Sequence, residues 1–293
     1  MGTCSVIQEN PLSTVLTSNP TARVAAQHPG IVKIGRVGWA AKGVVYFIAG
    51  FLAIMIVVKS FGWSSATNKE ASPTGAIKTI AGTTGGPLLL WSLAGGMLLY
   101  AAWRVVSAFM PGNNDAKSWA KRIGFAVSAV IYTTFAITAI SLARSTTAPA
   151  DGNSKVTTLT GRIMAHSNGR SLIGVVGAIV IGVGLYRLAK GIKQDVNDEL
   201  DLSAMSPERV RLTRKLGAAG EIGRGIAIGL IGFFLLRAAI TFNAGEATGL
   251  DGALRRLTLQ SWGPLIVAIV GLGFVSYGVF CLETFTHRRL EAP

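Results

Sequence analysis

The sequence contains few charged residues and very few acidic ones. Only 14% of its 293 residues are charged, whereas a soluble domain usually carries about a quarter. There are 14 acidic residues against 28 basic ones, with three histidines and two cysteines. This composition argues against a soluble globular protein and leaves few side chains for acid–base or metal-dependent catalysis.

Catalytic and targeting motifs are also lacking. No P-loop, nucleophile elbow or zinc-protease pattern occurs. The first 35 residues contain no apolar run that could form a signal peptide. Val6 stands where N-myristoylation requires Ser or Thr. Cys4 lies in a polar segment and Cys281 in an apolar one, so we expect no disulfide between them. We therefore predict a non-enzymatic protein with no cofactor and no metal.

Long apolar runs are abundant. Half of the residues are hydrophobic and the mean hydropathy is +0.48. Continuous apolar runs of about 20 residues can cross a membrane as helices, whereas a β-barrel would show short alternating segments. The sequence therefore predicts an all-α polytopic membrane protein with six transmembrane helices, at about 38–59, 86–109, 122–143, 171–190, 217–240 and 263–285.

The basic residues predict the orientation. With six spans, both termini lie on one side of the membrane. We assign 18 Lys and Arg residues to that side and 10 to the other, which accounts for all 28. Because basic residues accumulate in cytoplasmic loops, we expect both termini in the cytoplasm and the protein in the bacterial inner membrane.

The six runs form three copies of a two-helix unit. In the first helices, Gly38-Trp39-Ala40-Ala41-Lys42-Gly43 matches Gly220-Glu221-Ile222-Gly223-Arg224-Gly225, and Gly124-Phe125-Ala126-Val127-Ser128-Ala129 is a weaker match. In the second helices, Trp103-Arg104 matches Tyr186-Arg187 and Phe280-Cys281. Such parallel repeats predict a pseudo-threefold axis along the membrane normal. We expect a polar cytoplasmic tail over 1–33, repeats over 34–111, 119–193 and 216–286, and a cytoplasmic linker over 194–215.

These repeats resemble a known bacterial membrane family. The stretch from Gly35 to Gly43 fits the signature Gly-Arg-x-Gly-aromatic-x-Ala-Lys/Arg-Gly, and the segment Leu200–Pro207 fits as well. The family is catalogued as domain of unknown function 1206, and the resemblance covers about residues 34 to 285. It implies three two-helix repeats in a membrane and implies no activity.

Six charged residues inside or near the spans are the candidate site residues: Lys42, Arg104, Arg187, Glu221, Arg224 and Glu283. Lys42 and Arg224 occupy equivalent positions; they could form a basic ring that binds anionic lipid or substrate, or could extend to the membrane interface. Arg104 and Arg187 could do the latter too, or pair with Glu221 or Glu283. Glu221 could form a purely structural pair with Arg224 three residues later.

The net charge of +14 predicts membrane lipid as the partner and no nucleic acid, because basic residues beside spans attract anionic headgroups. Asp195, Asn197, Glu199 and Asp201 predict a solvated acidic turn, followed by a basic helix that Ser206 caps and Pro207 begins. The favoured function is a lipid- or partner-binding scaffold. The alternative is a channel or small transporter that uses the central axis.

Overall fold

The computed structural model describes residues 29–60, 70–109, 116–144, 152–194 and 206–285. Residues 1–28 of the predicted tail over 1–33 and the predicted acidic turn over 195–201 lie outside the described residues, and residues 29–33 belong to the first helix. The described part consists of helices and contains no strand. The predicted all-α fold is confirmed.

Six long helices each contain a stretch that is long and apolar enough to cross a membrane. These helices are α3 (Pro29–Ser60), α5 (Gly86–Phe109), α6 (Ala116–Arg144), α8 (Gly169–Ile192), α9 (Pro207–Thr241) and α11 (Gly263–Thr284). Between the two long helices of each repeat lies a shorter one: α4 (Pro73–Ala81), α7 (Gly152–Met164) or α10 (Leu250–Leu257), the last preceded by the 3-10 turn η3 (Ala244–Glu246). The six predicted spans are therefore present.

The start of α9 follows from local sequence. The Ser206 side chain accepts a hydrogen bond from the Arg209 backbone N–H at 3.5 Å, and Pro207 occupies the first turn. An N-cap serine satisfies an amide that the helix leaves unpaired, and proline needs no partner there. Residues 207–215 of the predicted linker are consequently the first turns of α9.

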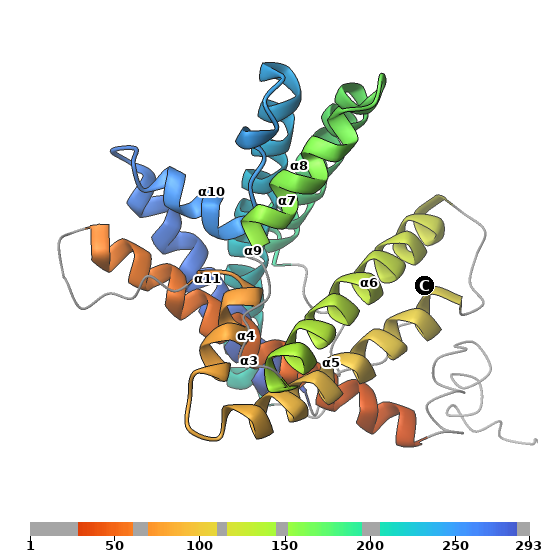
Figure 1. The fold of residues 1–293 in the computed structure, drawn as a ribbon. Coiled ribbons are helices and arrows are strands. Elements are labelled where there is room, and N and C mark those ends of the chain that lie inside the picture. The colour runs from red at the N-terminus through yellow and green to blue at the C-terminus, as the bar shows by residue number, and fades with distance from the viewer. Residues whose placement is uncertain (1–28, 61–69, 110–115, 145–151, 195–205, 286–293) are drawn as a thin grey trace, which may run out of the picture.

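The repeats pack on one another in a cyclic order. The second helix of each repeat lies against the first helix of the next, so that α5 packs on α6, α8 packs on α9, and α11 closes the cycle on α3. In Figure 1 these pairs extend as three arms: α3 with α11 to the left, α8 with α9 to the top, and α5 with α6 to the right. The two faces of the bundle can be told apart by the helix ends: α3 begins and α11 ends on what we call the terminal face.

Small residues at equivalent positions make these three interfaces close. A Cβ atom at Gly50 would lie 2.6 Å from the Gly271 carbonyl oxygen, and one at Gly232 would lie 2.9 Å from the Gly177 carbonyl oxygen. Helices in lipid associate through such close backbone packing because lipid supplies no hydrophobic drive. The equivalent small residues are Gly43 and Gly50 with Gly278 and Gly271, Gly225 and Gly232 with Gly184 and Gly177, and Ala129 and Ala136 with Ala101 and Ala94.

The two helices within a repeat pack on each other only in repeats 1 and 3. There, α3 contacts α5 and α9 contacts α11, whereas α6 and α8 share no packing interface over their described lengths. Gly273 lies against Gly223 in repeat 3, and Gly96 against Ala41 in repeat 1. The equivalent residues of repeat 2 are Ile179 and Val127, which are too large for the same approach. The pseudo-threefold arrangement is therefore open on one side.

Candidate functional site

A buried lysine lies among four aromatic rings where the α3–α11 pair meets the α5–α6 pair. The Lys42 ammonium of α3 is 4.4 Å from the ring centre of Trp39, 5.1 Å from that of Tyr277, 5.3 Å from that of Tyr100 and 5.6 Å from that of Tyr132. It also donates to the Tyr100 hydroxyl at 3.5 Å. A desolvated ammonium gains about 2 kcal/mol from an aromatic face, which partly offsets the cost of its burial.

Arg224 of α9 lies beside this lysine site and uses the same tyrosine. Its guanidinium carbon is 4.2 Å from the Tyr277 ring centre and 5.4 Å from that of Tyr46. Its Nη1 pairs with Glu221 Oε1 at 2.8 Å, and Arg187 Nη1 of α8 pairs with Glu221 Oε2 at 2.9 Å. The Glu221 carboxylate therefore forms ion pairs with two guanidinium groups. The pairing holds α8 to α9 within the bundle.

These groups form one body, which we call the central cluster: Lys42, Arg187, Glu221, Arg224, Trp39, Tyr46, Tyr100, Tyr132 and Tyr277. Two of its ring pairs meet edge to face, with centres 4.6 Å apart for Tyr100 and Tyr132 and 5.0 Å apart for Tyr46 and Tyr277. Such arrangements are favoured because the positive ring edge meets the negative ring face. At this level, aromatic and cationic side chains occupy the middle of the bundle.

Five of the six candidate site residues lie in or beside this cluster. Lys42 and Arg224 are buried among other side chains and do not extend to the surface of the bundle. The predicted pairs of Glu221 with Arg224 and with Arg187 are confirmed. Arg104 donates to the Tyr100 hydroxyl through Nε at 2.9 Å and Nη2 at 2.7 Å, which joins it to the cluster.

Glu283 lies apart from the cluster. It pairs with Arg209 at 3.3 Å; the Arg209 side chain is exposed and that of Glu283 is partly exposed. This pair connects α11 to the start of α9 at the terminal face. Neither Arg104 nor Arg187 pairs with Glu283 through any contact within the described residues, so that alternative is not realised there.

The tyrosines of the cluster were not among the candidates. Tyr46 and Tyr132 occupy the same position in their repeats, eight residues after Gly38 and Gly124 respectively. Tyr100 and Tyr277 are likewise equivalent. The repeat alignment could have identified these tyrosines if it had been extended by one helical turn, after Lys42 in the first helix and before Arg104 in the second. Aromatic residues at repeated positions near a cation suggest a cation–π site.

A second polar centre lies on the face opposite the terminal face. The buried Asp251 carboxylate accepts the Ala71 backbone N–H at 2.7 Å, the Arg255 Nε at 2.8 Å and the Asn153 amide at 3.4 Å. It thus connects the segment before α4 with α7 and α10, one short helix from each repeat. A hollow of about 540 Å³ beside it is lined by residues of α7 and α10, among them Thr157 and Arg256.

Comparison with known proteins identifies the family. The model of Domain of Unknown Function (DUF1206) matches three times, over residues 37–110, 123–194 and 219–283. The chain belongs to the DUF1206 family. Each match covers one repeat, which agrees with the resemblance seen in the sequence.

One relative of this DUF1206 chain is the uncharacterized protein YxxB of Bacillus subtilis (strain 168). It is 31% identical over 265 residues, which cover 89% of this chain and 93% of the relative. No solved structure matches the chain. The family and the six candidate spans support a multi-pass membrane protein with an internal repeat.

Proposed function

We propose that the protein is a non-enzymatic scaffold of the bacterial plasma membrane that binds anionic lipid at its terminal face, with both termini in the cytoplasm. The observation that supports this proposal is the charge of that face. Arg209, Arg211, Arg214 and Lys215 begin α9, and Lys190 lies in the last turn of α8. Each basic residue near an anionic leaflet contributes about 1 kcal/mol of attraction.

The central cluster supports a fixed bundle. Its ion pairs and ring contacts join α3, α5, α6, α8, α9 and α11. Because the side chains of the central cluster fill the middle of the bundle, they favour a packed scaffold over an open channel at the depth of the cluster. The two Glu221 ion pairs and the ring contacts restrain these helices, while the Nε atoms of Arg187 and Arg224 have no hydrogen-bond partner among the described residues.

Lipid enrichment tests the lipid-binding proposal. The purified full-length protein would be placed in nanodiscs of equal phosphatidylglycerol and phosphatidylcholine, then extracted in mild detergent. We expect the co-purified lipid to be enriched in phosphatidylglycerol, with the enrichment decreasing at high salt as screening weakens surface attraction. A lipid ratio equal to that of the nanodisc would contradict the proposal.

A second candidate function, transport along the central axis, is favoured by the ionisable residues buried in the spans. Charged groups within a membrane frequently mark ion or substrate pathways. Liposomes containing wild-type protein or the Glu221→Gln variant would be compared for ion and proton flux. If the protein is a scaffold, liposomes with either protein should show the same flux as liposomes without protein. Flux through the wild type above that of empty liposomes would instead support transport, and its loss in Glu221→Gln protein that is shown to be folded would assign it to this carboxylate.

A further inference from the structure

The surface of α6 and α8 that corresponds to the buried seam of the other repeats is exposed in repeat 2. Trp103 and Phe280, in repeats 1 and 3, are 8% and 1% exposed, whereas the equivalent Tyr186 is 69% exposed. The same contrast holds along both helices. The exposed seam of repeat 2 consists of Val127 and Ile131 on α6 and of Val176, Ile179, Val183 and Tyr186 on α8.

This seam differs from an ordinary lipid-facing surface because its equivalents mediate helix packing. In repeats 1 and 3 the matching positions hold α3 to α5 and α9 to α11. In repeat 2 the two helices share no packing interface, and in Figure 1 the α6 ribbon lies apart from the α7 and α8 ribbons. Both helices therefore expose apolar residues of the seam.

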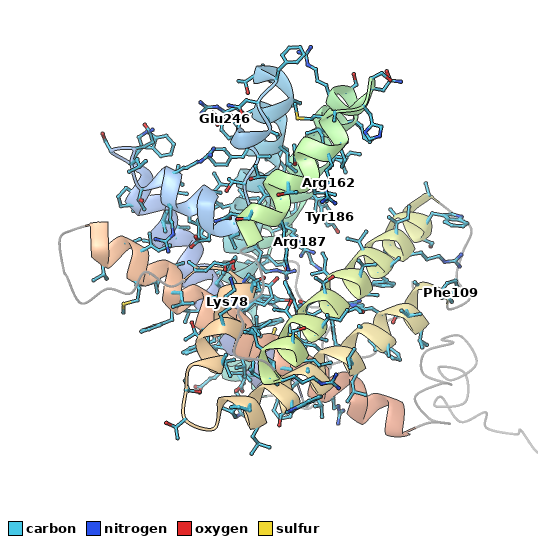
Figure 2. The ribbon with its side chains drawn as sticks, in the orientation of Figure 1. Lys78, Phe109, Arg162, Tyr186, Arg187 and Glu246 are labelled. Atoms are coloured by element: carbon cyan, nitrogen blue, oxygen red, sulfur yellow. The ribbon has the colours of Figure 1, made fainter. Side chains whose placement is uncertain are left out.

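Basic residues lie where the exposed seam reaches the terminal face. The Arg187 side chain is 31% exposed; its Nη1 pairs with Glu221, and its buried Nε has no partner among the described residues. Figure 2 shows Arg187 and Tyr186 between the α7–α8 arm and the α6 arm. Lys190 follows Arg187 by less than one turn on α8, and Lys121 and Arg122 lie in the first two turns of α6.

The charge of the two helices favours a lipid over a second protein molecule. Together α6 and α8 contain seven basic residues and no Asp or Glu. A second molecule that paired through the same seam would bring these like charges together, as the isologous contact of a twofold dimer requires. An anionic phospholipid supplies acyl chains for the seam and a phosphate for the guanidinium group.

We propose that one anionic phospholipid occupies the space between α6 and α8, with its phosphate at Arg187 and its acyl chains along the exposed seam. This inference rests on the proposed lipid-binding function and assigns its specific site. The lipid replaces the helix–helix contact that Val127 and Ile179 prevent, and it closes the third side of the bundle.

Native mass spectrometry of the purified full-length protein with added phosphatidylglycerol or phosphatidylcholine tests the site. The variant Val127→Ala/Ile179→Gly carries the residues of repeat 1 and lets α6 approach α8. The matched control Val130→Ala/Leu185→Gly changes exposed residues of the same helices outside the seam. We expect affinity for the first phosphatidylglycerol to decrease about tenfold in the seam variant, because α6 and α8 can then close over the site, and to remain within about twofold in the control.

A second variant and a cross-link complete the test. Arg187→Gln should remove the preference for phosphatidylglycerol over phosphatidylcholine, while thermal unfolding reports whether the variant folds. Equal phosphatidylglycerol retention by all variants would overturn the seam site and leave the proposed function standing. A wild type without that preference would overturn the proposed function itself. Disulfide-linked dimers of Val127→Cys/Ile179→Cys would place a second molecule in the space and overturn the lipid assignment.

Discussion

At the residue scale, one position on the second helix of each repeat meets one position on the first helix of the next. Arg104 lies 4.8 Å from the ring centre of Phe125, and Arg187 pairs with Glu221. Phe125 and Glu221 are equivalent residues, so the same place in the fold is stabilised by a cation–π contact in one interface and by an ion pair in another.

The third interface contains neither arrangement. Cys281 replaces the arginine, and Trp39 stands at the position of Phe125 and Glu221. The Trp39 indole N–H donates to the Thr284 hydroxyl at 3.1 Å, and its ring lies 6.4 Å from that of Phe280. A buried indole N–H needs such an acceptor. Without the arginine here, the nearby Lys42 supplies the positive charge.

Glu221→Gln should destabilise the bundle strongly. The change removes the carboxylate that pairs with both Arg187 and Arg224, and Arg224 is buried. An uncompensated buried charge costs about 3 kcal/mol. We expect a clear decrease in the thermal unfolding temperature of the detergent-solubilised protein.

Glu283→Gln is the matched control for that prediction. Glu283 pairs with Arg209, whose side chain is 60% exposed. Exposed pairs contribute at most about 1 kcal/mol, so the unfolding temperature should change little. Equal decreases in unfolding temperature for the two substitutions would show that the central cluster contributes no more to stability than an exposed ion pair.

At the element scale, helix pairing is controlled by side-chain size at a few repeated positions. Glycine or alanine at the equivalent positions allows close approach in the three interfaces between repeats. Valine and isoleucine at two positions of repeat 2 accompany the separation of α6 from α8. Because close packing is the main attraction between helices in lipid, a few methyl groups decide which helices pair.

Gly184→Ala should weaken the contact of α8 with α9. A Cβ atom there would lie 2.7 Å from the Gly229 backbone nitrogen and 2.8 Å from the Gly225 carbonyl oxygen, neither of which can move without its helix. Such overpacking costs about 1–3 kcal/mol. Urea or thermal unfolding in detergent would measure the loss.

Gly182→Ala provides the control on the same helix. A Cβ atom at Gly182 meets nothing within 4 Å, so the substitution adds only helix propensity. We expect stability equal to or slightly above that of the wild type. If Gly182→Ala were as damaging as Gly184→Ala, the cause would be glycine loss in general rather than the interface.

Asp251→Ala should loosen the three short helices. The carboxylate accepts hydrogen bonds from the Ala71 amide, Arg255 and Asn153, and its loss leaves the buried Ala71 N–H without this acceptor. An unsatisfied buried donor costs about 1–3 kcal/mol. Amide hydrogen exchange in 70–81 should accelerate. Asp251→Asn keeps an acceptor oxygen and should cause a smaller change, and identical exchange in both variants would argue against this role.

At the scale of the whole molecule, six candidate spans and an excess of basic residues on one face predict how the protein is oriented in the membrane. We expect a green fluorescent protein fused to the C-terminus to fluoresce and a C-terminal alkaline phosphatase to be inactive, since both results require a cytoplasmic terminus. A fusion at Thr83, on the opposite face, should give the reverse pattern. Active phosphatase at the C-terminus would reverse the proposed orientation.

Much of the architecture could be predicted from sequence because it depends on local or repeated features. Hydropathy alone located the six spans, and recurring glycines and basic residues identified three repeats. The pair of Glu221 with Arg224 was predictable too, since residues three apart on a helix are neighbours. These features require no knowledge of how the helices are arranged.

The tertiary structure alone decided the environment of Lys42 and the opening of repeat 2. Trp39 and Thr284 are 245 residues apart in the sequence, and the rings around Lys42 come from four helices. Burial of a cation depends on those distant partners, so no local pattern could separate an interfacial lysine from one enclosed by tyrosines. Likewise, Val127 and Ile179 are unremarkable apolar residues until the packing of repeats 1 and 3 shows that their positions require small side chains.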